Sequence, residues 1–455
     1  MSARPDGAGP AGDHSGVLDA LVRGEWEEPG TGVRHGIPID AIAIRDSLDG
    51  AEAELVAMRH PGESLVVVSD PFTRDALGRR VLAALETAGL PVTEFVWEKP
   101  SCCEQGVETV REATRGRDAL IAVGSGTIND TVKYASWLDG RPYSVFPTSP
   151  MNAYTTSTAS VAFGGFKKSI TCHGARGVFF DLSVLARCPP RLVSAAFADV
   201  ICRTTAQVDW LLSHLLFDTA YAETPYALLA IDEPEMIRRA DEMLAGDTDA
   251  LALLTRIAAI MGLGTSFTVT THSGSMHEHM ISHYIDMFAG DAHPGSSHGE
   301  QVGVATVTMS RLQNAMLGLE RPPELRPTAI PEARLRECFA PSVADNLVEQ
   351  SRVKALDARA SDALNARLER DWSALRARLG EALLPFDVLH RAMGEAGCRR
   401  TASELELDPV FYREAVANAR WTRDRYGMLD LAGDAILPDD GAGSHLEAFV
   451  ESMPT

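Results

Sequence analysis

The chain has 455 residues, 45% of them hydrophobic, and its 63 acidic and 42 basic residues give a formal net charge of −21. A field of that sign repels phosphate backbones and argues against nucleic acid as a partner. Seven cysteines without a Cys-x-x-Cys pair argue against a disulfide framework. No membrane span is expected, since no stretch approaches about 20 apolar residues. We expect a cytoplasmic protein that acts on a small molecule.

The first part of the chain alternates short apolar runs with amphipathic ones. Residues 1–20 lack an apolar core and are expected to be a disordered tail. Strands that alternate with helices predict a parallel sheet covered by helices, which we place at residues 21–190. The expected strands are residues 64–70, 92–97, 119–123, 143–147, 167–171 and 177–180, and the expected helices are residues 73–88, 105–115 and 127–137.

After residue 190 the apolar spacing becomes helical. No convincing strand appears there, so residues 191–455 are predicted to form an all-helical domain. The expected helices are residues 192–216, 234–244, 249–261, 276–287, 304–316, 348–379 and 387–396. The fold class is therefore α/β, with a parallel-sheet domain followed by an all-α domain.

A glycine-containing turn, Gly124-Ser125-Gly126-Thr127, follows the predicted strand at 119–123 and precedes a helix. Glycines there let a diphosphate approach the backbone, and the helix N-terminus supplies positive potential. The turn indicates a dinucleotide site. A tight strand-to-helix turn without a ligand is the alternative.

A histidine cluster follows in the helical part. His279 and His283 are four residues apart, on one face of a helix, and His298 is close in sequence. Imidazole suits Zn, Fe, Ni and Cu, and a catalytic zinc-type site usually has three protein ligands and one open position. The cluster indicates a divalent metal site. A solvated polar helix end is the alternative.

These motifs together resemble the iron-containing alcohol dehydrogenase and dehydroquinate synthase superfamily. The similarity covers residues 60–310 in the same order, including residues 174–210 and the motifs at His279 and His298. The forms SGSMHEHMISHYID and HGEQVGVAT are most similar to sn-glycerol-1-phosphate dehydrogenases and their bacterial relatives. The matching positions of the phosphate loop and the next strand are Gly124, Gly126, Thr127, Asp130, Lys133, Pro147 and Thr148.

The resemblance implies a metal centre. Asp199, His279 and His298 would ligate one divalent metal, with zinc preferred and iron or nickel as alternatives, and His283 would contact substrate. A buried hydrogen-bonding carboxylate is the other interpretation of Asp199. Small residues beside Asp199 would let another helix approach; they are Ala195, Ala196 and Ala198.

Two further histidines in this region, His277 and His293, have no counterpart in the superfamily and are expected to be surface residues. Asn152 stands where the superfamily has a substrate-contacting Asp, and it keeps a hydrogen-bonding shape without the charge. Lys167 and Lys168 are candidates to counter an anionic group on the substrate, although paired lysines usually belong to a solvated strand end.

The cofactor is expected to be NAD(H) in preference to NADP(H). Asp70 ends a strand where the resemblance places an acidic residue against the adenosine ribose, and a carboxylate there repels a 2′-phosphate. The alternative is a strand-end cap. The expected cofactor-binding residues are Asp70, Gly124, Ser125, Gly126, Thr127, Asp130, Thr148, Ser149 and Thr156.

The resemblance implies a metal-dependent, NAD(P)-linked alcohol dehydrogenase that interconverts dihydroxyacetone phosphate and sn-glycerol 1-phosphate or a similar anionic pair. Asp199, His279, His283 and His298 would be catalytic, and Asn152 and His283 would bind substrate. One alternative is a dehydrogenase of another small polyol, aldehyde or phosphonate. A sugar-phosphate cyclase, expected to carry Glu at position 199, and a degenerate metal- or nucleotide-binding regulator are less favoured. We expect a homo-oligomer.

Overall fold

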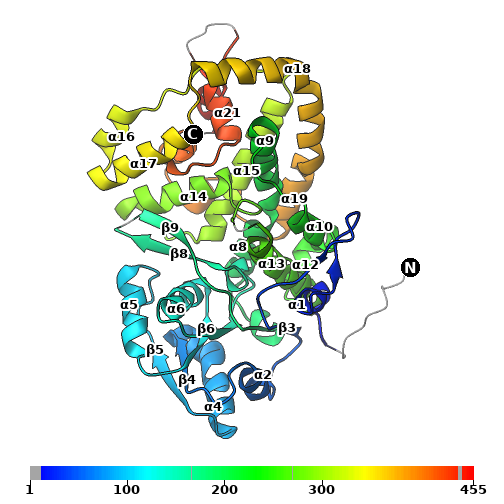
Figure 1. Ribbon diagram of the computed structural model, residues 1–455, viewed down its shortest axis with the longest axis vertical. Helices are drawn as coiled ribbons and strands as arrows, with labels where there is room; N and C mark the ends of the chain where they lie inside the picture. Colours follow the sequence, from blue (N-terminus) through cyan, green and yellow to red (C-terminus); the bar gives the residue numbers. More distant parts are fainter. Residues whose placement is uncertain (1–11, 165, 269, 439–442, 455) are drawn as a thin grey trace. The chain divides into compact units, whose positions relative to one another are not determined.

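The computed structural model describes residues 12–164, 166–268, 270–438 and 443–454 (Figure 1). The chain is divided between two compact units. Unit 1 comprises Met1–Ala196 and Glu223–Val269, and unit 2 comprises Phe197–Ala222 and Thr270–Thr455. The sequence led us to expect one continuous domain after residue 190. The units are instead discontinuous, because residues 223–269 belong to unit 1 while the segments before and after them belong to unit 2.

Unit 1 is built on six parallel strands in the order β3-β10-β7-β6-β4-β5 (Figure 1). Four of them are buried along their whole length, which is typical of a parallel sheet covered on both faces. The predicted parallel sheet is confirmed. Its strands are β3 (Ala41–Arg45), β4 (Leu65–Ser69), β5 (Val92–Val96), β6 (Ala119–Gly124), β7 (Tyr143–Pro147) and β10 (Gly177–Asp181).

The helices between these strands agree with the 3.6-residue spacing of the apolar positions. The expected helix at residues 73–88 begins as two short turns before it becomes regular. The helices are α2 (Glu52–Arg59), α3 (Pro71–Thr73), η1 (Arg74–Gly78), α4 (Arg79–Thr87), α5 (Glu104–Ala113), α6 (Gly126–Leu138) and α7 (Leu182–Leu185).

One predicted strand lies outside the main sheet. Residues 167–171 belong to β9 (Phe166–Thr171), which pairs antiparallel with β8 (Thr158–Phe163) in a separate hairpin. The sequence analysis did not predict β8, because Thr158 and Ser160 interrupt its apolar residues. A further small pair joins β1 (Trp26–Glu27) to β2 (Arg34–His35).

The N-terminal segment is ordered where it is described. Helix α1 (Val17–Val22) begins inside the expected disordered tail, and residues 1–11 of that tail lie outside the described residues. Leu18 and Leu21 are fully buried, and Ser15 Oγ accepts a hydrogen bond of 3.2 Å from the backbone of β3. For residues 12–20 the prediction of disorder is wrong, because these contacts outweigh the low hydrophobicity of the stretch.

Four helices after residue 222 belong to unit 1: α10 (Thr224–Leu229), α11 (Glu233–Arg238), α12 (Ala240–Leu244) and α13 (Thr248–Thr268). Helix α13 packs closely on η2 (Asn152–Tyr154), since a Cβ on Gly262 would lie 2.2 Å from Asn152 O. By length and composition α13 is apolar enough to cross a membrane, but 78% of its most apolar window is buried in the protein. It is longer than the helix expected at residues 249–261.

In the described part of unit 2, the regular structure is helical apart from two paired two-residue strands, β11 (Glu324–Leu325) and β12 (Ala435–Ile436). The expected helix at 192–216 is two helices that meet at Cys202, and the expected helix at 348–379 is broken at residues 355–357. The helices are α8 (Pro190–Ile201, shared with unit 1), α9 (Arg203–Phe217), α14 (His277–Phe288), η3 (Gly290–Ala292), α15 (His298–Leu317), α16 (Glu332–Cys338), α17 (Pro341–Lys354), α18 (Ala358–Ala382), α19 (Phe386–Glu395), η4 (Ser403–Leu405), α20 (Pro409–Asn418), η5 (Ala419–Thr422), α21 (Met428–Asp434) and α22 (His445–Ser452).

Candidate functional site

Three side chains that are distant in sequence come together in unit 2. Asp199 lies on α8, His279 lies on α14, and His298 is the first residue of α15. One ligand atom from each lies within 4.8 Å of the others. His279 Nε2 is 3.3 Å from Asp199 Oδ1, and the His279 and His298 ring centroids are 5.1 Å apart. Asp199 and His279 are buried.

Close packing of α8 against α15 brings Asp199 to the histidines. A Cβ on Gly303 would lie only 2.8 Å from the Cβ of Ala198. This confirms that small residues beside Asp199 admit a second helix. The start of α15 is fixed by a capping box, in which Glu300 Oε2 accepts hydrogen bonds from Ser297 N at 2.7 Å and Ser297 Oγ at 2.9 Å. His298 therefore has a defined position in the first helical turn.

The hydrogen bonds around His298 select its tautomer. Ser282 Oγ donates to Gln301 Oε1 at 2.8 Å, so it accepts from His298 Nδ1–H at 3.1 Å. Gln301 is itself oriented because its Nε2 donates to Asp286 Oδ1 at 3.0 Å. The proton is thus on Nδ1 of His298, and the lone pair is on Nε2. Ser282 and Gln301 were missed by the sequence analysis, although each lies three residues after a histidine of the cluster.

His279 is oriented in the same way. Its Nδ1 lies 2.9 Å from Glu278 Oε1, so Nδ1–H donates to this carboxylate and Nε2 faces Asp199. Met276 N also donates to Glu278 Oε1, at 2.6 Å. Burial lowers the pKa of His279, but hydrogen bonds to Asp199 and Glu278 raise it to about 9. A pair of carboxylates that favours a positive charge at this point also favours a metal cation.

The donor set therefore fits a divalent metal. Two imidazole nitrogens and one carboxylate are a usual three-ligand set for a catalytic site, and both histidines have an outer partner that fixes the ring. A second grouping of Cys202, Glu278 and His279 is a weaker metal site. Burial raises the pKa of the Cys202 thiol well above its usual value, and Sγ donates to Asp199 O at 2.9 Å.

His283 lies one helical turn after His279 but outside the group of three donor atoms. Its ring is stacked on that of His298, with centroids 5.8 Å apart and an interplanar angle of 23°. Arg423 Nη2 lies 3.3 Å from His283 Nδ1. His283 therefore faces the same site as the metal donors without joining them. Arg423 was not identified from the sequence, because it lies 140 residues further along the chain.

The expectation that His277 is a surface residue is wrong. Its side chain is fully buried, with Nδ1 2.7 Å from Asp209 Oδ2 and Nε2 3.1 Å from Asp430 Oδ2. Both carboxylates are distant in sequence, so no local pattern indicated the contact. His293 is partly buried and lies 3.2 Å from Asp286 Oδ1.

The glycine-containing turn lies between a strand and a helix of unit 1, as the sequence predicted. Gly124 ends β6, Ser125 is the N-cap of α6, and Gly126 is the first residue of that helix. A Cβ on Gly124 would lie 2.9 Å from Ile128, so the fold itself requires this glycine. A Cβ on Gly126 would meet only Ala153, at 3.7 Å. The missing side chain at Gly126 thus suits a ligand that approaches the backbone.

The structure gives Asp130 an internal role. Its Oδ1 accepts from Asn129 Nδ2 at 3.0 Å and Lys133 Nζ at 3.2 Å, and its Oδ2 accepts from Ser160 N at 3.0 Å. Lys133 is fully buried and also donates to the carbonyl oxygens of residues 153 and 158, at 2.8 Å each. The pair joins α6 to the chain that follows β7, so Asp130 supports the loop rather than pointing away from the protein.

The remaining predicted cofactor residues lie in the segments that follow β6 and β7. Ser149 is buried, with Oγ 2.9 Å from Tyr154 Oη, and Tyr154 donates to Gly124 O at 3.1 Å. Thr148 N donates to Gly124 O at 3.2 Å. Thr156 Oγ1 lies 3.0 Å from the hydroxyl of residue 158. Thr127 is partly exposed in the first turn of α6.

Asp70 caps a helix, which is the alternative role that the sequence allowed. Its Oδ1 accepts from Phe72 N at 2.9 Å and Thr73 N at 3.0 Å. Phe72, next to it, is 87% exposed. Asn152 begins η2 and is partly buried against α13. The roles of Asp70 toward ribose and of Asn152 toward substrate remain predictions.

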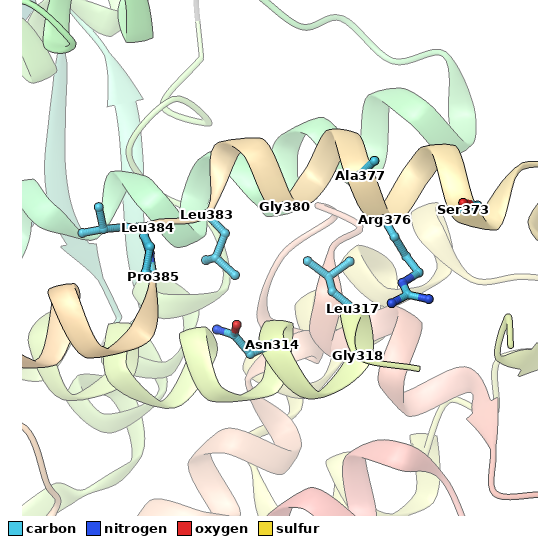
Figure 2. A pocket seen from close by; sticks show the side chains of 10 residues that line it. All are labelled: Asn314, Leu317, Gly318, Ser373, Arg376, Ala377, Gly380, Leu383, Leu384 and Pro385. Atoms are coloured by element: carbon cyan, nitrogen blue, oxygen red, sulfur yellow. The ribbon is translucent and has the colours of Figure 1, made fainter. Parts of the chain in front are cut away.

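Unit 2 also has an open groove of about 620 Å³ between the end of α15 and the C-terminal part of α18 (Figure 2). Leu317 and Leu383 point into the gap between the two helices. Its lining contains no His, Cys, Asp or Glu among the described residues, so it offers no competing metal or acid–base site. The lining residues are Asn314, Leu317, Gly318, Ser373, Arg376, Ala377, Gly380, Leu383, Leu384 and Pro385.

A family model for iron-containing alcohol dehydrogenase matches residues 44–189. The chain is 29% identical over 256 residues to a glycerol-1-phosphate dehydrogenase of Halalkalibacterium halodurans, covering 54% of this chain and 64% of that protein, just under two thirds of its length. It is 28% identical over 319 residues to the enzyme of the same name from Geobacillus stearothermophilus, covering 67% of this chain and 78% of that protein.

The fold is shared with solved structures of much lower sequence similarity. The crystal structure of glycerol dehydrogenase from Schizosaccharomyces pombe matches with a TM-score of 0.61 at 15% identity, covering 94% of this chain and 91% of that chain. Over residues 44–189 the chain is therefore similar to iron-containing alcohol dehydrogenases. Among curated proteins, the chain is similar to glycerol-1-phosphate dehydrogenases.

Proposed function

We propose that this protein is a metal-dependent, NAD(P)-linked dehydrogenase that interconverts dihydroxyacetone phosphate and sn-glycerol 1-phosphate or a similar small anionic carbonyl and alcohol pair. The observation that carries the proposal is the convergence of Asp199, His279 and His298, with their ligand atoms within 4.8 Å of one another. The names of the similar proteins from H. halodurans and G. stearothermophilus supply the reaction and the use of NAD(P).

The chemistry divides between bound groups and side chains. Asp199, His279 and His298 would hold a divalent cation that would supply Lewis-acid polarisation of the carbonyl oxygen, and bound NAD(P)H would supply the hydride. Glu278 and Ser282 keep the two imidazoles in the tautomer that presents Nε2 to the site. His283, one turn from His279, binds a substrate oxygen.

The proposal extends to the cofactor and the metal. NADH is preferred over NADPH, because a carboxylate at Asp70 would face the ribose and repel a 2′-phosphate. Replacing Asp70 by Gly should relax that preference, although it also removes a helix cap. Zinc is the preferred metal, with iron and nickel compatible with the same donors. The assembly is a homo-oligomer in the cytoplasm.

The decisive experiment follows NADH oxidation by absorbance. The metal-loaded protein is given dihydroxyacetone phosphate, the uncharged analogue dihydroxyacetone, and a panel of other aldehydes and ketones, including carbonyl phosphonates. We expect the highest kcat/KM with dihydroxyacetone phosphate and a preference for NADH. Turnover of a panel compound at a much higher kcat/KM would instead favour a dehydrogenase of another small polyol, aldehyde or phosphonate, which the uncharged Asn152 leaves open.

Two other functions have less support. A sugar-phosphate cyclase would be expected to carry Glu at position 199, where this chain has Asp. A non-enzymatic regulator would not need two ligand histidines that are each oriented by a hydrogen-bond partner. Purified protein that neither holds metal nor oxidises NADH with any carbonyl compound would favour the regulator.

A further inference from the structure

A partly buried arginine from the C-terminal part of the chain lies beside the candidate metal centre. Arg423 follows η5, and its Nη2 lies 3.3 Å from His283 Nδ1. The His283 ring is stacked on the His298 ring at 5.8 Å. One imidazole therefore separates the guanidinium from a proposed metal ligand.

The segment that carries Arg423 is anchored on both sides of it. Asp424 N donates to Gln350 Oε1 at 3.1 Å. Arg425 donates through Nη1 to Ser275 O and through Nη2 to Thr271 Oγ1, the latter at 2.8 Å. These bonds tie the segment to α17 and to the residues that precede α14. Arg423 is thus held in place by its neighbours and is not a mobile surface side chain.

The surroundings of Arg423 favour a negative charge. Burial lowers the pKa of its guanidinium, and the carboxylate of Asp424 opposes this only in part. Burial and the charge of Arg423 also lower the pKa of Arg425, to about 10. A guanidinium that is partly removed from water is stabilised by an anion that accepts its hydrogen bonds.

Arg423 also sets the hydrogen-bonding state of His283. A guanidinium has only donors, so His283 Nδ1 must accept, and its proton must be on Nε2. His283 then presents a second N–H donor beside the guanidinium. A tetrahedral oxyanion, with several acceptor oxygens, matches such a pair of donors.

We infer that Arg423, together with His283 Nε2–H, forms the subsite that binds the anionic group of the substrate. The inference rests on the proposed function and deepens it, because it assigns the recognition of a phosphate or similar oxyanion to the segment after η5. The sequence-based candidates for this task, Lys167 and Lys168, lie on β9 in unit 1. Lys168 is exposed, with Nζ 5.9 Å from the Phe163 ring centre.

The test compares charged and uncharged substrates on the metal-loaded enzyme. Arg423→Met removes the charge at similar side-chain length. Arg423→Lys keeps the charge but loses the planar guanidinium group with its several donors. Arg359→Met, at an exposed position, is the matched control. For Arg423→Met we expect KM for dihydroxyacetone phosphate to rise about 10- to 150-fold, the range for a lost hydrogen bond to a charged group. KM for dihydroxyacetone should change less than about 3-fold, a negligible loss on that scale. Arg423→Lys should be intermediate.

Metal content and NADH affinity should be unchanged in Arg423→Met, which separates loss of the subsite from loss of the fold. An equal loss with both substrates would overturn the inference, because it would mean that Arg423 only supports the structure. A selective loss in Lys168→Met but not in Arg423→Met would also overturn it.

A binding experiment decides the inference even if the proposed reaction is wrong. Inorganic phosphate is titrated calorimetrically into metal-loaded wild type, Arg423→Met and Arg359→Met without any carbonyl compound. We expect binding to wild type and Arg359→Met and at least a 10-fold weaker affinity for Arg423→Met. Equal affinity in all three, or no binding by wild type, would overturn the subsite. Phosphate binding without turnover of either carbonyl would reject the proposed reaction alone.

Discussion

His277 lies between Asp209 and Asp430 at the first position of α14, and all three side chains are buried. Burial lowers its pKa, but the two carboxylates raise it above the ordinary value. Removing the imidazole breaks this buried contact, although Lys354 still donates to Asp430 at 2.8 Å and Gln313 to Asp209 at 3.0 Å. We expect His277→Ala to lower the free energy of unfolding by about 3–5 kcal/mol, measured by urea denaturation. This replaces the nearly neutral effect expected for a surface residue.

The partly buried His293 provides the comparison for this substitution. His293→Ala should change the free energy of unfolding by no more than about 1 kcal/mol, because its partner Asp286 is also partly exposed. A His277→Ala variant as stable as His293→Ala would show that the buried carboxylates find other partners at no cost.

Elemental analysis of variants should distinguish the three proposed metal ligands from His283. Asp199→Ala, His279→Ala and His298→Ala should each lose bound metal and activity while retaining the fold. His283→Ala should keep its metal, since His283 lies outside the donor group, and lose activity by roughly 10- to 150-fold through one charged hydrogen bond. Full metal occupancy in the three ligand variants would refute the site. Metal loss in His283→Ala would make His283 a ligand.

His272 makes a pH-dependent contribution to stability. Burial and then the charge of Arg425 lower its pKa from 6.5 to about 3. The unfolded chain therefore binds a proton that the folded chain does not, and stability is lost as pH falls from 6.5 toward 3, at up to about 1.4 kcal/mol per pH unit. His272→Phe keeps the stack on Trp210 (6.0 Å) without a titrating group. Its unfolding free energy should fall less steeply between pH 6.5 and 4, and a slope equal to that of wild type would contradict the assignment.

At the scale of elements, contact between α8 and α15 decides where Asp199 lies relative to His298. Gly303→Ala would put a Cβ 2.8 Å from Ala198 Cβ and 3.2 Å from Met393 Cε, so the helices must separate. We expect a loss of about 1–3 kcal/mol in unfolding free energy, together with weaker metal binding in a competition titration with a chelator.

Gly380 in α18 is the matched control for this helix contact, because a Cβ there would meet nothing within 4 Å. Gly380→Ala should stabilise the protein by about 0.5–1 kcal/mol, since alanine favours the helix more than glycine does. Unchanged metal affinity in Gly303→Ala would mean that the helix spacing does not control the ligand geometry.

At the scale of the whole molecule, metal should stabilise the folded chain because its three ligands come from three helices. A ligand that binds only the folded state adds about 2.7 kcal/mol when its free concentration is 100 times Kd. Chelation should therefore lower Tm in scanning calorimetry by several degrees. Asp199→Ala should show little response to the same chelator, and an equal response would place the metal elsewhere.

The glycine-containing turn and the parallel sheet could be predicted from local sequence. The continuous apolar run at residues 119–123 is a strand because a sheet covered on both faces buries every side chain of such a run. The turn could be predicted because few backbone conformations join a strand directly to a helix through glycines. The helical spacing of His279 and His283 likewise identified one helix face with His298 close in sequence, and the resemblance added Asp199.

Tertiary structure alone decided the rest. His277 and His283 lie on the same helix, but their partners Asp430 and Arg423 are about 150 residues away in sequence. The spacing of nearby residues therefore cannot predict these contacts. The same holds for the break at residues 355–357, where Asp357 caps a new helix by accepting from Ala360 N at 2.7 Å. Local sequence determines which elements form, because propensity and periodicity act over a few residues. Packing determines which polar groups are buried together, because that depends on segments brought together only when the chain folds.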